Sequence, residues 1–202
     1  MGANVTIIDS GGANIASLVY ALERLGAGTQ LTTDPHAIRS AERVILPGVG
    51  AARDAMQRLS NAGLCDVVRE LTQPVLGVCL GMQLLADASE EDDATCLGIV
   101  PGTATRLPAS PDLPVPNMGW CPLRSTRESA LLDGVDDGAW CYFVHSYALP
   151  VSEHTVGVAR HDDEFAAVIE YRNFAATQFH PERSSTTGAT ILANFLRWTP
   201  CA

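Results

Sequence analysis

The stretch VLGVCLGMQLLA, residues 75–86, places a cysteine between two glycines where a strand pattern gives way to a helix pattern. Its first residues are apolar and β-branched, which is typical of a buried strand, whereas its second half reads as the opening of a helix. Cys79 therefore falls at a strand-to-helix turn, with Gly77 and Gly81 on either side. Such a turn exposes a side chain at the top of a sheet and requires small neighbours, so the pattern indicates a nucleophile. A buried structural cysteine beside two packing glycines is the alternative that this stretch alone leaves open.

The chain before this stretch alternates strand-like and helix-like segments. We expect strands at 5–9, 30–32, 43–46 and 75–78, and helices at 14–25, after residue 50 with Ala52, Met56 and Leu59 in one stripe, and at 64–71. With the two consecutive helices before residue 75 taken as one helical segment, the order β-α-β-β-α-β predicts a mostly parallel sheet with helices on both faces. Ligands of such sheets bind beyond the carboxyl ends of the strands, where residues 9–12, residues 47–50 and Cys79 fall.

The second half of the chain differs in composition and in its pattern of expected elements. An acidic loop at 89–93 and proline-rich segments precede further strand-like runs, which we expect at 142–147, 155–159, 167–171 and 175–180, before a closing helix at 187–198. Sequential strands of this kind predict an antiparallel C-terminal extension of the sheet. We therefore expect a single α/β domain over residues 1–202, with a mostly parallel central sheet flanked by helices.

Composition excludes several classes of function. The formal net charge is −10 with only 13 Lys and Arg residues, which provides no basic footprint for nucleic acid. No apolar run reaches the roughly 20 residues that span a bilayer, and no signal-peptide pattern is present, so we expect a cytoplasmic protein without a membrane association. The six cysteines form no C-x-x-C pair, so we expect no metal site and no cofactor.

A thiolate nucleophile needs a base, and His180 stands apart from the other histidines because it lies in the run FHPE, residues 179–182. On an extended segment, residues two apart point to the same side, so Glu182 can orient the imidazole of His180. The free ring nitrogen can then face a thiol, as in a nucleophile–base–orienter triad. By itself this run favours a surface His-Pro-Glu turn.

Together these runs resemble the class I, triad-type glutamine amidotransferase family over essentially the whole chain. The three signatures, in the expected order, are PGVG at 47–50, GVCLGMQ at 77–83 and FHPE at 179–182. The resemblance implies that Cys79 attacks the side-chain amide of glutamine, that His180 acts as acid and base, and that Glu182 orients His180. Ammonia leaves and a glutamyl thioester is hydrolysed.

The resemblance also implies the residues that surround the nucleophile. The backbone N–H groups of Val49 and Leu80 would form the oxyanion hole. The glutamine itself would be held by Gly50, Gln83, His145, Ser146 and Tyr147.

Three further segments resemble the branch of the family that serves histidine biosynthesis: DSGGAN at 9–14, PNMGW at 116–120 and YFVHSY at 142–147. That branch implies a heterodimer in which the partner, a cyclase subunit, is a (βα)₈ barrel that uses the ammonia to make imidazole glycerol phosphate and an aminoimidazole carboxamide ribotide. The implied interface comprises Gly12, Asn14, Ser17, Asn117, Met118, Trp120, Tyr142 and Arg183. Arg183 stands where many relatives have Lys, which keeps the charge but changes its geometry.

Three alternatives remain at this point. A glutaminase subunit for pyridoxal phosphate or anthranilate synthesis would share the triad but not residues 117–120. A cysteine peptidase would leave the glutamine-pocket residues without a role, and a non-catalytic interaction protein would have no need of an intact triad. We also expect weak activity in isolation, because Gly48 and Gly50 would let the Val49 peptide reorient when a partner docks.

Overall fold

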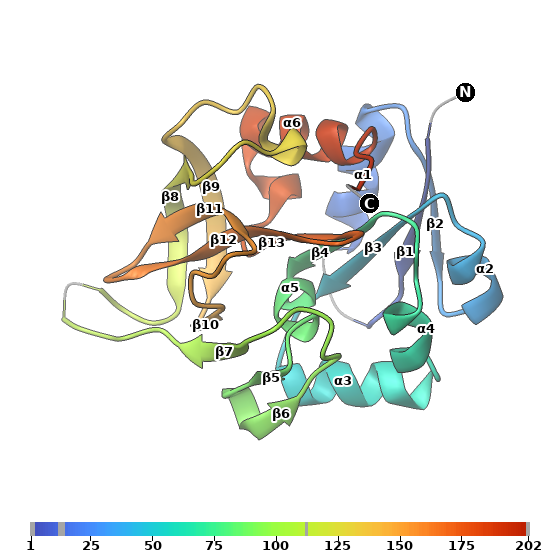
Figure 1. Cartoon of the computed structure of the whole chain (residues 1–202), viewed down its shortest axis with the longest axis horizontal. Coiled ribbons are helices and arrows are strands. Elements are labelled where there is room, and N and C mark those ends of the chain that lie inside the picture. The colour runs from blue at the N-terminus through green and yellow to red at the C-terminus, as the bar shows by residue number, and fades with distance from the viewer. Residues whose placement is uncertain (1–2, 12–14, 112, 201–202) are drawn as a thin grey trace.

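A nine-stranded mixed sheet runs through the centre of the molecule, with helices on both of its faces (Figure 1). The computed structural model describes residues 3–11, 15–111 and 113–200. The strands of the parallel half are, in spatial order, β2 (Gly28–Thr32), β1 (Asn4–Ile8), β3 (Arg43–Gly48), β4 (Val75–Cys79) and β13 (Phe174–Thr177). The antiparallel half continues with β12 (Glu164–Tyr171), β11 (Thr155–Arg160), β8 (Asn117–Ser125) and β9 (Ala139–His145).

The helices divide between the two faces of the sheet. The helices are α1 (Ile15–Arg24), α2 (Pro35–Arg39), α3 (Ala52–Asn61), α4 (Cys65–Arg69), α5 (Leu80–Leu84) and α6 (Ser185–Phe195). In Figure 1, α1 and α6 lie above the sheet, and α3, α4 and α5 lie below it. Each face has its own apolar core, and neighbouring strand residues contribute to opposite cores: Ile7 packs on the side of α1 and Ile8 on the side of α3. Burying one such side chain stabilises the fold by about 1.5–3 kcal/mol.

Shorter elements complete the chain. A small second sheet contains β10 (Tyr147–Ala148), β7 (Thr103–Arg106), β5 (Ala88–Ser89) and β6 (Ala94–Thr95). Three 3₁₀ turns are η1 (Glu91–Asp93), η2 (Ala130–Leu132) and η3 (Pro181–Arg183).

The predicted fold class is confirmed, as are the strands and helices expected before residue 86. One helix, the five-residue α2, is absent from the prediction. Its local signal is nevertheless present: the Asp34 carboxylate accepts a hydrogen bond from the His36 N–H at 3.0 Å, and Pro35 occupies the first helical position. The N-cap residue Asp34 followed by Pro35 is therefore a sequence signal that indicates where this helix begins.

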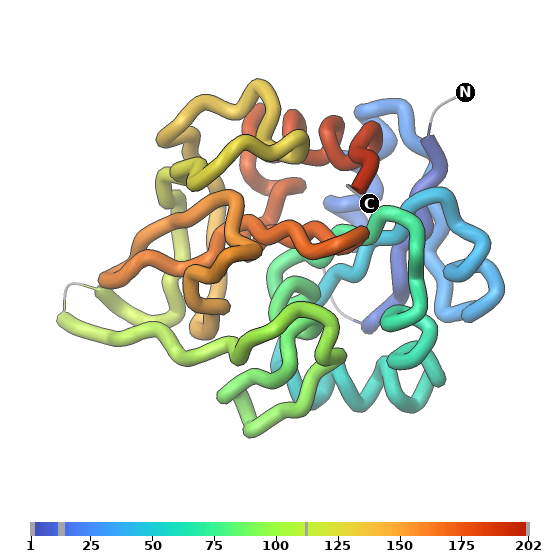
Figure 2. The backbone as a smooth tube through the Cα atoms, viewed as in Figure 1, coloured from blue at the N-terminus to red at the C-terminus, as the bar shows by residue number. Residues whose placement is uncertain are grey.

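The antiparallel extension is confirmed with two corrections. The longest strand, β8, was not predicted as a strand, and it lies between β11 and β9 in the sheet. The expected strand at 175–180 is the shorter β13, which is antiparallel to β12 but parallel to β4. In Figure 2 the orange-red tube of β13 runs beside the green tube of β4, although about a hundred residues separate them in the chain.

The glycines around Cys79 allow α5 to approach β3 and β4 closely. A Cβ at Gly81 would overlap the carbonyl oxygen of Leu46, and a Cβ at Gly48 would lie 2.6 Å from the Gly81 nitrogen. A Cβ at Gly77 would lie 3.0 Å from the Gly81 carbonyl carbon. The glycines are therefore required by backbone contact between a strand pair and the helix that follows the cysteine.

We predict that Gly81→Ala destabilises the protein by about 3 kcal/mol or more, because β3 or α5 must move to admit the methyl group. The measurement is urea-induced unfolding. Gly63→Ala is the control, since Gly63 has a positive φ, of 67°, but a Cβ there would have open space around it. The control should lose only about 1 kcal/mol from backbone strain. Equal losses for both variants would contradict the close-approach explanation.

Candidate active site

Cys79 occupies a strained turn between β4 and α5. Its backbone angles, φ 54° and ψ −114°, lie in a region that residues with a Cβ rarely adopt. The residue is 7% exposed, and its Sγ lies 3.8 Å from the carbonyl oxygen of Val144. The strain is held in place by the backbone contacts of the flanking glycines, so the thiol has a fixed position at the carboxyl edge of the sheet.

Parallel pairing brings three strand ends together at this edge. In the register of β3 and β4, Gly48 lies beside Cys79, so Val49 follows directly next to the nucleophile. In the register of β4 and β13, Thr177 pairs with Val78, so His180 lies just beyond the end of β13 on the other side. The three segments that the sequence singled out are therefore neighbours in space.

His180 contacts both Cys79 and Glu182. Its Nδ1 lies 2.9 Å from a carboxylate oxygen of Glu182, whose side chain is 3% exposed, and the His180 side chain also forms a hydrogen bond with Cys79. Burial lowers the pKa of His180, but the hydrogen bonds with Cys79 and Glu182 and the negative charge of these groups outweigh burial and raise the pKa to about 10. This environment stabilises the protonated, imidazolium form of His180.

The local conformation of this segment differs from the prediction. The sequence predicts extended backbone over residues 180–182, whereas His180 alone is extended and η3 begins at Pro181. Proline at the first position of a helical turn has the required φ and lacks an N–H that would otherwise need a partner. The turn brings the Glu182 carboxylate back to His180. The predicted contact therefore forms through a helical turn and not through two side chains on the same side of an extended segment.

A cavity of about 530 Å³ opens beside the cysteine. Its lining includes the predicted residues Val49, Gly50, Cys79, Leu80, Gln83, His145, Ser146, Tyr147 and His180, together with Arg183. Three lining residues, Glu91, Pro116 and Val144, were missed by the sequence prediction. The Glu91 carboxylate accepts a hydrogen bond from the Ala52 N–H at 2.8 Å, and burial raises its pKa. Glu91 belongs to the acidic loop at 89–93. The charge of this loop was the only feature of the sequence that could have drawn attention to Glu91 as a site residue.

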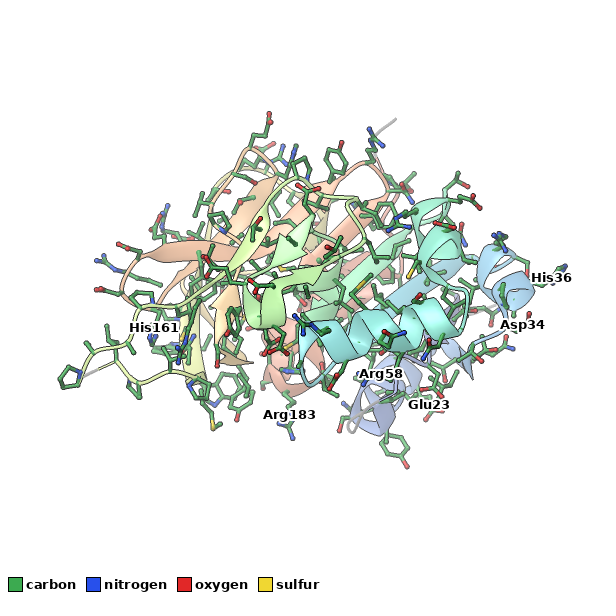
Figure 3. The ribbon with its side chains drawn as sticks, turned by 90° about the horizontal axis from the view of Figure 1, so that it is seen from below. Glu23, Asp34, His36, Arg58, His161 and Arg183 are labelled. Carbon is green, nitrogen blue, oxygen red and sulfur yellow. The ribbon has the colours of Figure 1, made fainter. Side chains whose placement is uncertain are left out.

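The segment that carries Val49 is held at its start. The Ser10 hydroxyl donates a hydrogen bond to the Pro47 carbonyl oxygen at 2.9 Å, and the Arg58 guanidinium on α3 donates to the Ser10 carbonyl oxygen. Figure 3 shows Arg58 at the side of α3 that faces α1. Gly50 has a positive φ, of 88°, and open space around it. Val49 therefore lies between Gly48, which is held by its pairing with β4, and Gly50, whose backbone has more conformational freedom. The N–H of Leu80 is at the start of α5.

Four of the eight residues predicted to contact a partner lie on one side of the molecule. Met118 and Trp120 are 65% and 48% exposed, and the Trp120 ring packs edge-on against Tyr142 with their centroids 5.8 Å apart. Arg183 projects away from the molecule in Figure 3, with its guanidinium 5.8 Å from the centre of the Tyr142 ring. These four side chains form one outer face, which we call the aromatic face.

The other predicted interface residues do not join the aromatic face. Asn117 is buried, 8% exposed, and contacts His145 instead of solvent. Ser17 is half-buried on α1. Gly12 and Asn14 lie outside the residues that the structure describes.

Two kinds of feature, metal-ligating clusters and membrane-spanning helices, are not found in the described residues. In that part of the chain, no cluster of three or more His, Cys, Asp or Glu side chains is arranged to hold a metal ion. Within the same residues, no helix is long and apolar enough to cross a bilayer.

The geometry combines a positioned thiol, an imidazolium oriented by a buried carboxylate and a cavity whose lining includes Val49 and Leu80. This set can carry out nucleophilic acyl transfer, in which a thiol attacks a carbonyl carbon and an imidazolium protonates the leaving group.

Comparison with known proteins agrees with this arrangement. The family model described as "Glutamine amidotransferase class-I" matches residues 6–198. A protein from Xanthomonas axonopodis pv. citri named imidazole glycerol phosphate synthase subunit HisH is 50% identical over 193 residues, which cover 96% of both chains. The protein of the same name from Idiomarina loihiensis is 48% identical over 198 residues, 98% of this chain and 100% of that one.

Solved structures share the fold at low sequence identity. A structure described as a glutamine amidotransferase has a TM-score of 0.74 at 19% identity, covering 96% of this chain and 97% of that chain. The glutaminase domain of the Trypanosoma brucei protein described as CTPS has a TM-score of 0.67 at 17% identity, covering 96% of this chain and 92% of that chain.

We predict that Glu182→Gln lowers the pKa of His180 toward its ordinary value of about 6.5, because the variant loses a carboxylate charge. The stabilisation linked to a raised histidine pKa is complete below about pH 6.5 and disappears as the pH rises through the folded-state pKa. The stability difference between wild type and variant should therefore shrink from pH 6 toward pH 10. The measurements are NMR titration of the His180 ring and chemical unfolding across this range.

Glu153→Gln is the matched control, because Glu153 is exposed and lies 4.0 Å from a different histidine, His154. An unchanged His180 pKa in Glu182→Gln would mean that the carboxylate does not stabilise the imidazolium.

Proposed function

Because this chain belongs to the class I glutamine amidotransferase family, we propose that it is the glutaminase subunit of imidazole glycerol phosphate synthase in histidine biosynthesis. The observation that carries the proposal is the contact chain from Cys79 through His180 to Glu182 at the edge of a cavity. The match to two subunits of that synthase over almost their full lengths supports the pathway. It favours this synthase over those that make pyridoxal phosphate or anthranilate.

The reaction follows from the contacts of His180. The Cys79 thiolate forms a bond to the side-chain carbonyl carbon of glutamine, and the electron pair of the C=O bond moves to the oxygen. The His180 imidazolium gives its proton to the amide nitrogen as the C–N bond breaks, which releases ammonia and leaves a glutamyl thioester. His180, now neutral, takes a proton from water as the water oxygen attacks the thioester. Glutamate leaves and the thiolate–imidazolium pair is restored.

In this proposal, two backbone N–H groups stabilise the negative oxygen in both steps. Leu80 supplies one at the start of α5, and Val49 supplies the other when its peptide is turned toward the cavity. One such donor typically contributes about 3–4 kcal/mol to transition-state stabilisation. The Val49 donor is the variable one, because the backbone of Gly50 is free to adopt alternative conformations.

The cavity suits a free amino acid. Glu91 places a carboxylate in its wall, which is complementary to an α-ammonium group. Gln83 places an amide there, which can hydrogen-bond to the polar end of the substrate.

The partner in this proposal is the cyclase subunit of the synthase, whose (βα)₈ barrel docks on the aromatic face in a heterodimer and receives ammonia. The aromatic face consists of exposed Met118, Trp120 and Arg183 with half-buried Tyr142, and these residue types are enriched at protein interfaces. The net charge of −10 is consistent with a phosphorylated substrate bound by the partner and not by this chain. The proposal includes a cytoplasmic location.

We predict that the purified chain releases glutamate from glutamine slowly when alone and at least about tenfold faster with the ligand-bound cyclase subunit, since docking would turn the Val49 N–H into the site. Cys79→Ala should abolish the release under both conditions. Glutamate formation is measured by a coupled assay. If the rate of glutamate release is the same with and without the cyclase subunit, the glutaminase reaction stands but the assignment to this synthase is contradicted. Full release by Cys79→Ala would contradict the reaction itself.

We predict that Trp120→Ala weakens cyclase binding by about 2 kcal/mol, as for an aromatic interface anchor, while changing thermal stability little. Isothermal titration and thermal unfolding measure the two effects. Leu31→Ala is the control, because Leu31 is a similarly exposed apolar residue on β2, at the opposite edge of the sheet. A Trp120 variant that unfolds readily but binds the cyclase normally would make Trp120 a structural residue.

A further inference from the structure

Four buried polar side chains lie together at the wall of the cavity, which Gln83 and His145 line. Asn117, His145, Gln83 and Gln178 are 8%, 5%, 4% and 0% exposed. They come from β8, β9, α5 and the residue after β13, so the group spans both halves of the sheet. Buried polar groups of this kind are costly unless their hydrogen bonds are made, and made bonds fix their orientation.

His145 has both ring nitrogens occupied. Nδ1 lies 2.9 Å from the Tyr147 carbonyl oxygen, which can only accept, so Nδ1 carries the hydrogen and donates. Nε2 lies 3.0 Å from the Asn117 amide nitrogen and accepts from it. The Asn117 oxygen accepts from the Cys121 thiol at 3.7 Å, which fixes the amide in this orientation. Burial also lowers the pKa of His145 to about 4, so the ring is neutral at physiological pH.

The carbonyl that His145 holds also fixes Gln83. The Gln83 amide nitrogen donates one hydrogen to the Tyr147 carbonyl oxygen at 2.8 Å and the other to the Gln178 side-chain oxygen at 3.1 Å. Both hydrogens are therefore directed into the protein. The Gln83 oxygen is the part of this amide that is left to accept a hydrogen bond from a ligand.

We propose that Asn117 and His145 are positioning residues that hold the Tyr147 carbonyl, and through it Gln83, so that Gln83 presents its oxygen to the hydrogen-bond donors of the substrate. This inference rests on the proposed function and assigns His145 an indirect role instead of direct contact with glutamine. The His145 ring is also packed against Phe143 and Phe165, with centroids 5.6 and 4.9 Å away, which keeps it aligned. Asn117 and His145 are directly opposite each other in the register of β8 and β9.

The test compares two electrophiles that alkylate Cys79. Acivicin is a glutamine analogue and must use the substrate pocket, whereas iodoacetamide needs only the reactive thiolate. His145→Phe removes both hydrogen bonds of the ring. We expect it to slow acivicin labelling about tenfold and to raise the KM for glutamine by a similar factor. We expect kcat and iodoacetamide labelling to change by less than about threefold, because the variant leaves Cys79 and His180 in place.

His145→Asn is the rescue variant, because its amide nitrogen can occupy the position of Nδ1 and donate to Tyr147. It should recover a large part of the acivicin rate. His154→Phe is the control for losing a histidine elsewhere, since His154 packs on Tyr171 away from the cavity lining.

Three outcomes overturn the inference: unchanged acivicin labelling in His145→Phe, an equal loss of labelling by both electrophiles, or no recovery in His145→Asn. Failure of the proposed function is seen separately in the wild type, as an absence of acivicin labelling at Cys79 together with an absence of glutamate release.

Discussion

The parallel pairing of β4 with β13 is the constraint on which the site depends. It places the end of a strand from the first half of the chain beside the end of a strand from the second half, so Cys79 and His180 become neighbours. The pairing of β3 with β4 adds Val49 at the same edge. Because the carboxyl ends of parallel strands share one edge, a single sheet brings together the nucleophile, the base and the segment proposed to stabilise the oxyanion.

Close backbone contact makes this edge rigid. The glycines at 48, 77 and 81 remove side chains where α5 crosses β3 and β4, and the strained turn at Cys79 is held by those contacts. Electrostatics then acts on groups with fixed positions: His180 lies between Cys79 and Glu182 and is favoured as a cation. In the wall of the cavity, His145 has the opposite property, since it is buried and neutral. His180 is therefore suited to proton transfer, whereas His145 is suited to positioning its neighbours through hydrogen bonds.

The sequence singled out Cys79, His180 and the parallel half of the sheet because each has a local signal, and the structure brings the two residues together. A glycine-flanked cysteine, a His-Pro-Glu run and consecutive apolar residues can be recognised without knowing what they contact. The partner of β13 could not be predicted, since strand periodicity does not identify the neighbouring strand. Strand β8 was missed because Gly119 and Pro122 lower its strand propensity. Asn117 was assigned to the surface, and only its register opposite His145 reveals that it faces inward.

The most direct test of the central claim, that Cys79 forms a thioester with the side chain of glutamine, is to trap that intermediate. The chain would be mixed with isotope-labelled glutamine, quenched in acid within its turnover time, digested and analysed by mass spectrometry. The structure predicts a labelled glutamyl group on the peptide that contains Cys79, absent from Cys79→Ala and lost on treatment with hydroxylamine. Labelled glutamate released during turnover with no glutamyl group on that peptide, under conditions that preserve a control thioester, would contradict it.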